Sequence, residues 1–374
     1  MSVLAPAAPV TAEDRVSVAS NWRLVWWRFR KHRLALVSAL VLLLLYVVVL
    51  CPDFFSTQDP EATEARLAFI PIQRLHVFDG WRPAPWVPDV VGKRNPTTLR
   101  MEWRVDESRK VPVRFFVTGY SYRLLGIIPT RIHLVGAAAA DGRERLHLLG
   151  TDRLGRDQCT RLIHGTRTSM TIGLTAVTFS IVLGVLLGGI SGYFGGPADA
   201  VIQRLIELLQ SLPTIPIWLA LTAALPRDWS PQQVFFAITV ILSLVGWTTL
   251  GREVRGRFLA LREEDFVLAA ELAGASQGRI IIRHMVPTFL SHIIATSTLA
   301  IPAMIINETS LSFLGLGIRP PAISWGVLLQ EAQNIQTVAL APWLLVPGAV
   351  VILSVLAFNL VGDGLRDAAD PYSQ

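Results

Sequence analysis

The chain has 374 residues, of which 52% are hydrophobic and only 17% are charged, and its formal net charge is +6. Charged residues make up about 25% of an ordinary soluble protein, so this composition argues against a soluble enzyme and for a membrane protein. Nearly all of the positive charge is arginine, since lysine occurs only at Lys31, Lys93 and Lys110. Basic loops beside long apolar segments explain this balance without nucleic acid as a partner.

Six apolar segments are long enough to cross a bilayer, because about 20 apolar residues span ~30 Å of hydrocarbon as a helix. They cover approximately residues 34–50, 170–194, 202–225, 234–250, 288–311 and 342–361. Pro213, Pro216 and Pro302 interrupt two of these segments. A solute pathway would explain such breaks, but proline is common in membrane helices, so both interpretations are open. The sequence predicts an all-α polytopic membrane protein with six transmembrane helices.

Basic residues predict the orientation. The first segment is preceded by Arg23, Arg28, Arg30, Lys31 and Arg33, so the N-terminus is expected in the cytoplasm, and six crossings return the C-terminus to the same side. The arginine-rich connection 251–287 falls on that side too. The long stretch 51–167 lies outside, because long loops translocate largely regardless of charge. The expected parts are a cytoplasmic segment (1–33), the first helix (34–50), an external insert with its lead-in to the second helix (51–167), and a permeation core with five helices (168–374).

The external insert is long enough for a small core of its own. Residues 99–106 alternate between apolar and charged, the period of a half-buried strand. Residues 111–117 follow as a second strand, so a β-hairpin is expected between the two. Residues 74–81 are a third candidate strand, and the proline-rich stretch 82–88 predicts irregular structure. The insert is therefore predicted to be a small β-rich domain.

Two features of the insert leave alternatives open. Trp81, Trp86 and Trp103 either bind a ligand or form ordinary core. Cys51 and Cys159 flank the insert on the predicted outer side, where an oxidising compartment permits a disulfide. Two unpaired thiols are the alternative, because the sequence does not give the distance between them.

The sequence carries no G-x-x-x-x-G-K-[ST], H-E-x-x-H or G-x-S-x-G motif. No enzyme active site, metal site or bound cofactor is therefore expected in this chain. Arg204 and Glu207, three residues apart, are expected to pair along one helix face. Asn307 and Glu308 lie near the outer end of the fifth segment, where either both line a polar cavity on a solute pathway or Glu308 reaches the interface.

The cytoplasmic connection raises a further question, because residues 264–279 read as one short helix along the inner surface. Ala269, Ala270, Ala273 and Gly274 give this helix a face of small residues, which permits close docking of a partner. From the residues alone, an ordinary interfacial helix is the alternative.

This connection resembles the EAA-type cytoplasmic loop of ABC importer permeases, through its alanine pair, Gly274 and Val286–Pro287. VLAAELAGAS is similar to the oligopeptide/dipeptide (and nickel) branch of that family, the OppC/DppC type. WRFRKHRLAL at 27–36, LLGTDRLGRDQCTRLIHGTRTSM at 148–170 and ETSLSFLGLGIRPPAISWGVLL at 308–329 resemble other segments of the same branch. The resemblance covers both ends of the chain and does not cover residues 51–147.

The resemblance implies a type I ABC importer permease in the bacterial cytoplasmic (inner) membrane, translocating peptides or another solute such as a nickel complex or oligosaccharide. An ion-coupled secondary transporter and a membrane-anchored receptor are the competing classes. The implied partners are a second, OppB/DppB-like permease, two ATP-binding subunits that use ATP and Mg, and an external solute-binding protein. The implied ATPase-coupling residues are Ala269, Ala270, Gly274, Ala275, Ser276, Arg283, His284 and Pro287. The signature before the second helix comprises Gly150, Thr151, Asp152, Gly155, Arg156 and Asp157.

Overall fold

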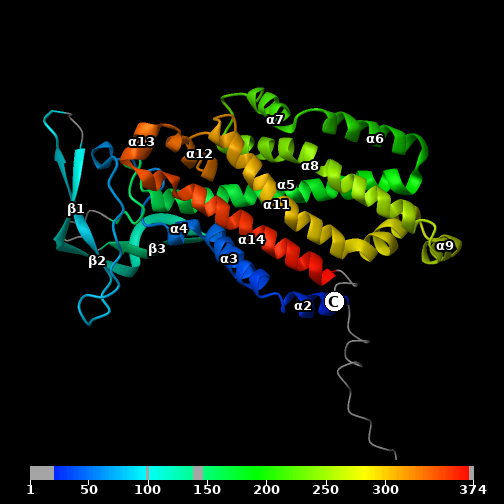
Figure 1. Ribbon diagram of the computed structural model, residues 1–374, viewed down its shortest axis with the longest axis horizontal. Coiled ribbons are helices and arrows are strands. Elements are labelled where there is room, and N and C mark those ends of the chain that lie inside the picture. The colour runs from blue at the N-terminus through cyan, green and yellow to red at the C-terminus, as the bar shows by residue number, and fades with distance from the viewer. Residues whose placement is uncertain (1–20, 98–100, 138–145, 370–374) are drawn as a thin grey trace, which may run out of the picture.

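The computed structural model describes residues 21–97, 101–137 and 146–369 (Figure 1). Parts of four predictions lie outside the described residues, namely 1–20 of the N-terminal segment, Leu99 and Arg100 of the first candidate strand, 138–145 of the insert and 370–374 of the core. The described residues form a long helical bundle with a β-sheet at one end (Figure 1). We call these the sheet end and, opposite it, the α9 end.

The helices of the bundle are α2 (Asn21–Phe29), α3 (Arg33–Leu50), α5 (Gln158–Phe194), α6 (Gly196–Ser211), α7 (Thr214–Ala223), α8 (Pro231–Leu261), α9 (Asp265–Leu272), α10 (Gln277–Arg279), η2 (Ile280–Met285), η3 (Val286–Phe289), α11 (Leu290–Phe313) and α14 (Val346–Ala369). The sheet end holds α4 (Pro52–Phe55), η1 (Ala65–Leu67), β1 (Trp86–Arg94), β2 (Met101–Leu124), β3 (Ile128–Ala137), α12 (Trp325–Gln330), η4 (Glu331–Gln333), α13 (Ile335–Leu340) and η5 (Pro342–Leu345).

Five helical segments within the described residues are long and apolar enough to cross a membrane. They agree with five of the six predicted spans, although several helices are longer than their apolar stretch. Helix α5, for example, begins twelve residues before the predicted span, at an N-cap formed by Asp157. Pro302 lies inside α11 without ending it, since membrane helices tolerate proline where neighbours re-satisfy the freed carbonyl.

The third predicted span, 202–225, is wrong as a single helix. The chain forms α6 and α7 instead, bent by 90° at the break, and six spans result only if this pair counts as one. Leu212 precedes Pro213 and has the extended backbone (φ −92°, ψ 140°) that a following proline favours. Pro216 falls in the first turn of α7, where its missing N–H costs no helical bond.

Helices α5 and α8 pack closely because glycines remove the side chains between them. A Cβ at Gly184 would lie 3.1 Å from the side chain of Leu250, and one at Gly188 would overlap the carbonyl oxygen of Gly251. At Gly192 it would lie 2.7 Å from the carbonyl oxygen of Arg255. The glycines at four-residue spacing on α5 therefore mark a helix–helix contact, as small residues do where membrane helices approach.

The sheet of the insert has the order β1-β2-β3, and both pairs of strands are antiparallel. Strand β2 is continuous through both segments that were expected to form a hairpin, so that hairpin is wrong. The first half of β2 pairs with β1 and the second half with β3. Polar residues 106–110 made the strand look interrupted, but antiparallel strands tolerate polar residues where one face is solvated.

Two other predictions for the insert are also corrected. Residues 74–81 form isolated bridges rather than a strand, and the proline-rich stretch supplies the start of β1. Trp86 stacks on His76 with ring centroids 4.2 Å apart, and Trp103 donates a 2.9 Å hydrogen bond to a backbone carbonyl, so both belong to the fold. Trp81 is fully exposed.

Cys51 and Cys159 are both free thiols, so the structure contains no bond between them.

Candidate functional site

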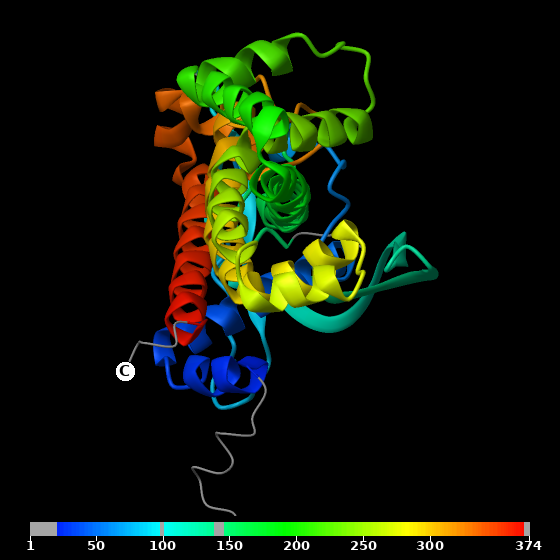
Figure 2. The same ribbon diagram turned by 90° about the vertical axis from the view of Figure 1, so that its right-hand side faces the viewer.

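Helix α9 lies at the end of the bundle opposite the sheet (Figure 1), the end that faces the viewer in Figure 2. One side of this helix is anchored. Val267 is fully buried and Ala270 half-buried, and both contact an apolar cluster. That cluster comprises Leu250, Val254, Phe258, Ile280, Met285, Phe289 and Ile293. The other side is exposed, with Leu268 at 45%, Leu272 at 90% and Ala269 between them. The helix therefore presents apolar side chains and a small residue outward.

Gly274 ends this helix, so the predicted single helix over residues 264–279 is wrong. Gly274 has φ +76° and donates a 2.9 Å hydrogen bond to the carbonyl of Glu271. The next residue, Ala275, donates to the carbonyl of Ala270 at 3.0 Å. These two bonds define a Schellman motif, in which glycine is favoured because a Cβ is strained at positive φ. Gly274 is thus required by the backbone, whereas a Cβ there would meet open space.

The second half of the loop returns the chain to the helical bundle as short helical turns. Ala275 packs against the apolar cluster, while Ser276 stands exposed at the start of α10. The chain then forms the π-helical turn η2 and the tighter turn η3 before α11. Arg283, His284 and Pro287 are all exposed. All of the coupling residues predicted in this loop are therefore accessible except Ala270 and Ala275, which are half-buried anchors.

Polar contacts join this loop and the neighbouring helix ends. The hydroxyl of Tyr193, at the end of α5, donates a 2.9 Å hydrogen bond to the carboxylate of Glu271 on α9. Arg255 on α8 donates two 2.6 Å bonds to the two carboxylate oxygens of Asp199 on α6. One hydrogen bond therefore links α9 directly to the end of α5, and the Arg255–Asp199 pair links α8 to α6.

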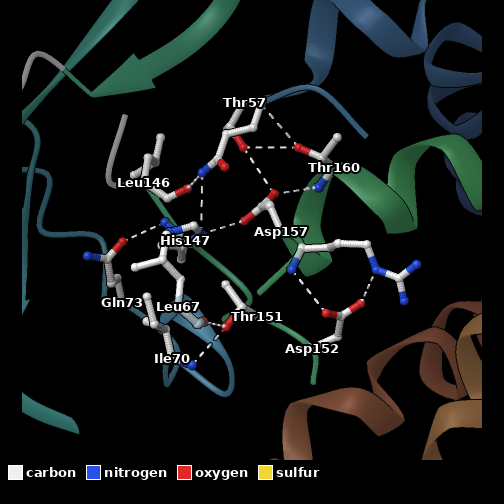
Figure 3. Close-up of polar contacts among 12 residues, drawn as sticks. Thr57, Leu67, Ile70, Gln73, Leu146, His147, Thr151, Asp152, Asp157 and Thr160 are labelled. Atoms are coloured by element: carbon white, nitrogen blue, oxygen red, sulfur yellow. Dashed lines mark hydrogen bonds and ion pairs between the residues drawn. The ribbon is translucent and has the colours of Figure 1, made fainter. Parts of the chain in front are cut away.

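The signature residues lie at the sheet end, around a buried carboxylate (Figure 3). Asp152 is 0% exposed and accepts hydrogen bonds from the backbone N–H groups of Leu154 (2.8 Å) and Arg156 (3.0 Å). Its second oxygen accepts from the guanidinium groups of Arg156 (2.6 Å) and Arg161. Both arginines also bind Glu331, at 2.6 and 3.0 Å. The buried Arg161 and Asp152 and the partly buried Arg156 and Glu331 thus form one cluster of two cations and two carboxylates.

Thr151 fastens the signature to the start of the insert (Figure 3). Its hydroxyl donates to the carbonyl of Leu67 at 2.6 Å and accepts from the N–H of Ile70 at 2.8 Å. Its carbonyl oxygen accepts a 2.9 Å bond from the indole of Trp343. One threonine therefore connects three segments that are far apart in the sequence.

The two signature glycines stand where no side chain fits. Gly150 has φ +70°, and a Cβ there would lie 2.6 Å from the carbonyl oxygen of Ile70 and 2.8 Å from the indole nitrogen of Trp343. Gly155 has φ +74°, and its Cβ would overlap the carbonyl of Glu64. Both positions need glycine because of backbone conformation and close approach together.

Asp157 caps α5 and ties it to the insert (Figure 3). Its carboxylate accepts from the N–H of Thr160 at 2.7 Å, as N-cap residues do, and from the hydroxyl of Thr57 at 3.1 Å. His147 Nδ1 lies 3.2 Å from its other oxygen, and the His147 N–H donates to the side chain of Gln73. The signature thus builds a clasp that joins both ends of the insert to the start of α5.

Arg161, Glu331, Gln73 and His147 complete this clasp, and the sequence did not single them out. Arg161 and Glu331 are 170 residues apart in sequence. In so apolar a chain, a charged side chain is the only sequence feature that could have pointed to Arg161 and Glu331, and it does not indicate which residue each one binds.

Glu308 is fully buried, which contradicts the alternative that it reaches the interface, while a place for it on a solute pathway stays a prediction. Its carboxylate accepts 2.8 Å hydrogen bonds from Ser169 on α5 and Ser312 on α11. The Ser169 hydroxyl in turn accepts from the backbone N–H of Trp325. Glu308 thereby joins α5, α11 and α12 inside the bundle. Asn307 is half-buried, and a place for it on a solute pathway stays a prediction.

Arg204 and Glu207 pair as predicted, at 2.9 Å, on an exposed face of α6. Among the residues that the structure describes, no group of three or more His, Cys, Asp or Glu side chains is placed to hold a metal ion.

Comparison with known families assigns the chain to a class. Residues 181–372, more than half of the chain, match the family model described as binding-protein-dependent transport system inner membrane component. Residues 20–71 match the N-terminal TM domain of oligopeptide transport permease C. The chain therefore belongs to the permeases of binding-protein-dependent ABC transporters. This match and the bundle confirm the predicted fold class, a polytopic type I ABC importer permease with a small β-rich insert.

Individual relatives agree with this class. The dipeptide transport system permease protein DppC of Alkalihalophilus pseudofirmus is 40% identical over 226 residues, which cover 60% of this chain and 72% of that protein. The oligopeptide transport system permease protein OppC of Bacillus subtilis is 36% identical over 226 residues, with the same coverage. Among solved structures, the inward-facing MetNI methionine ABC transporter is similar at 16% identity and a TM-score of 0.44, covering 55% of this chain and 95% of its own.

Proposed function

We propose that this chain is one permease subunit of an ATP-driven importer that carries peptides across the bacterial cytoplasmic membrane. Relatives named as dipeptide and oligopeptide permeases support peptides as the solute. The exposed apolar side of α9, anchored beneath by Val267, is the observation that carries the coupling role.

In this proposal a separate ATPase subunit binds α9 from the cytoplasm. Leu272 and Leu268 enter an apolar groove of that subunit, and Ala269, Ala273 and Gly274 allow close approach. Burying a leucine that is 90% exposed supplies about 1.5–3 kcal/mol of binding free energy. Closure of two ATPase subunits around ATP and Mg then pulls on α9 and tilts the bundle as a rigid body.

The remaining partners complete the assembly. A second, OppB/DppB-like permease supplies the other half of the pathway, and a solute-binding protein delivers the peptide outside. The α9 end then faces the cytoplasm, with both chain termini on that side, and the sheet end faces outward. Basic residues before α3 and along the connection 251–287 favour this orientation.

The test uses this chain purified with its candidate ATPase and second permease. Leu272→Asp places a charge in the proposed contact and should abolish ATPase association, because a desolvated, unpaired carboxylate is costly. The matched control is Ile127→Asp, which changes an apolar residue of similar exposure (80%) at the sheet end. Equal association of native protein and both variants would contradict the coupling role. Uptake of a nickel complex or oligosaccharide in place of peptide would redirect the solute assignment.

A further inference from the structure

A cavity of about 490 Å³ opens at the sheet end, where α5 and α8 begin. It lies between Pro60 and Glu61 near the start of the insert, the two helices and the loop that follows α11. Its polar and aromatic lining includes Glu61, Arg167, Thr168, Thr171, Gln232 and Phe235. Its volume is in the range of about 300–1,000 Å³ that is usual for small-molecule sites.

Two opposite charges line this cavity without neutralising each other. Glu61 and Arg167 are both exposed. Within the described part of the chain, no ion pair joins either side chain to an opposite charge or joins the two together. An unpaired carboxylate and an unpaired guanidinium that face one cavity can each bind the opposite charge of a single ligand. Arginine binds carboxylates with two parallel N–H···O bonds.

A stripe of hydroxyl groups continues from Arg167 into the membrane-spanning part of α5. Thr168, Thr171, Thr175 and Thr178 recur at helical spacing on the same face. Each hydroxyl donates to a carbonyl of its own helix, at 2.5–3.4 Å, so its lone pairs face outward and can accept hydrogen bonds. A polar stripe on a membrane helix is more consistent with a wet or solute-lined face than with lipid.

An aromatic pair follows the stripe. Phe179 on α5 and Phe236 on α8 meet edge to face, with ring centroids 6.3 Å apart, and both are exposed on the helix surface. Exposed residues on α5 beyond this pair are apolar, including Leu186 and Ile190. The charged and hydroxylated part of this face is therefore limited to the sheet end.

We propose that this cavity binds the two charged ends of a short peptide, with Arg167 on the carboxylate and Glu61 on the ammonium group. This inference rests on the proposed function, since it names how the imported peptide is recognised in this subunit. The hydroxyls of Thr168 and Thr171 accept hydrogen bonds from the peptide N–H groups, and the ring of Phe235 contacts a side chain. A ligand that lacks one of the two charges forms only one of these two contacts and therefore binds more weakly.

The test is photo-crosslinking in the whole complex, in nanodiscs and without the binding protein, so that only the permease selects. The probe is a radiolabelled tripeptide with one photoreactive residue and free ends. Unlabelled tri-alanine, its C-terminal amide and its N-acetyl form serve as competitors. In the native complex, tri-alanine should compete about tenfold better than either blocked form, the factor that 1.4 kcal/mol represents.

Each charge has its own expected effect. Arg167→Gln should remove the preference for the free carboxylate and keep the preference for the free ammonium group, and Arg167→Lys should restore part of it. Glu61→Gln should remove the preference for the free ammonium group and keep the preference for the free carboxylate. The controls Arg153→Gln and Glu107→Gln change exposed charges that do not line the cavity, and should keep both preferences.

Unchanged preferences in Arg167→Gln and Glu61→Gln would overturn the inference. Weaker labelling by all peptides alike, with preferences intact, would also overturn it, because it would reveal a structural role. ATP-dependent peptide uptake is measured separately on the native complex. Uptake with unaltered preferences in the variants refutes this site alone, whereas no uptake in the native complex refutes the proposed function.

Discussion

Asp152→Asn tests whether the signature clasp stabilises the protein. The substitution keeps the size of the side chain and one acceptor oxygen for the N–H groups of Leu154 and Arg156. It replaces the other oxygen with an NH₂ group, which would face the guanidinium groups of Arg156 and Arg161. The only carboxylate then left in the cluster is Glu331.

The magnitude follows from burial. Asp152 and Arg161 are 0% and 2% exposed, so water cannot replace the lost partner. Removing one member of a buried ion pair typically costs about 3–5 kcal/mol. The control Glu207→Gln breaks the Arg204 pair, whose side chains are 54% and 85% exposed. An exposed pair contributes about 0.2–1 kcal/mol, so this variant should be nearly neutral.

The assay is thermal unfolding of the purified chain in one detergent, followed by loss of the monodisperse peak on gel filtration. Asp152→Asn should unfold several degrees below the native chain, and Glu207→Gln within about a degree of it. A native-like unfolding temperature for Asp152→Asn would show that the cluster does not stabilise the fold.

Three further predictions concern single positions. Gly274→Ala should weaken the Schellman turn by about 1–2 kcal/mol and reduce the ATP hydrolysis that the solute-binding protein stimulates in the full complex. Asparagine tolerates positive φ, so Gly274→Asn should retain more of this hydrolysis, and equal rates in the two variants would argue against the role of the turn. Gly188→Ala should destabilise the α5–α8 contact, because its Cβ overlaps a backbone carbonyl. The control Gly256→Ala has no atom near its Cβ and should be neutral or stabilising by about 0.5–1 kcal/mol. Similar unfolding temperatures for the two variants would contradict the packing argument. Burial and the neighbouring Asp53 raise the pKa of Tyr120 above its ordinary value of 10.0, so the folded chain releases this proton at a higher pH than the unfolded chain. The stability of the fold should therefore fall as the pH rises above 10. Tyr120→Phe should reduce this loss of stability in alkaline unfolding curves, and an unchanged slope would refute the prediction.

Much of the bundle could be predicted because apolar length alone marks a membrane helix. The 90° bend between α6 and α7 could not, since Pro302 in α11 shows that proline alone does not decide whether a helix breaks. The continuous strand β2 was missed for a different reason. Its polar centre was taken for a turn, whereas pairing with two neighbours keeps it extended.

Sequence motifs locate the candidate sites, but the reason for each residue in them follows only from the three-dimensional structure. The sequence marked Gly274 as small, and the structure shows that its backbone conformation, at φ +76°, is what requires glycine. The sequence identifies the signature by resemblance but does not indicate its structural role, because Glu331, which binds Arg161, follows 170 residues later. The sequence does not reveal the charges of the cavity, since Glu61 and Arg167 line the same cavity only when the insert folds against α5.

The most direct test of the central claim is uptake of a labelled peptide into proteoliposomes that contain the full complex. Native complex with binding protein should accumulate peptide only when ATP is supplied on the α9 side, and Leu272→Asp should bind peptide outside without accumulating it. Accumulation without ATP, driven by an ion gradient and unaffected by Leu272→Asp, would contradict the account.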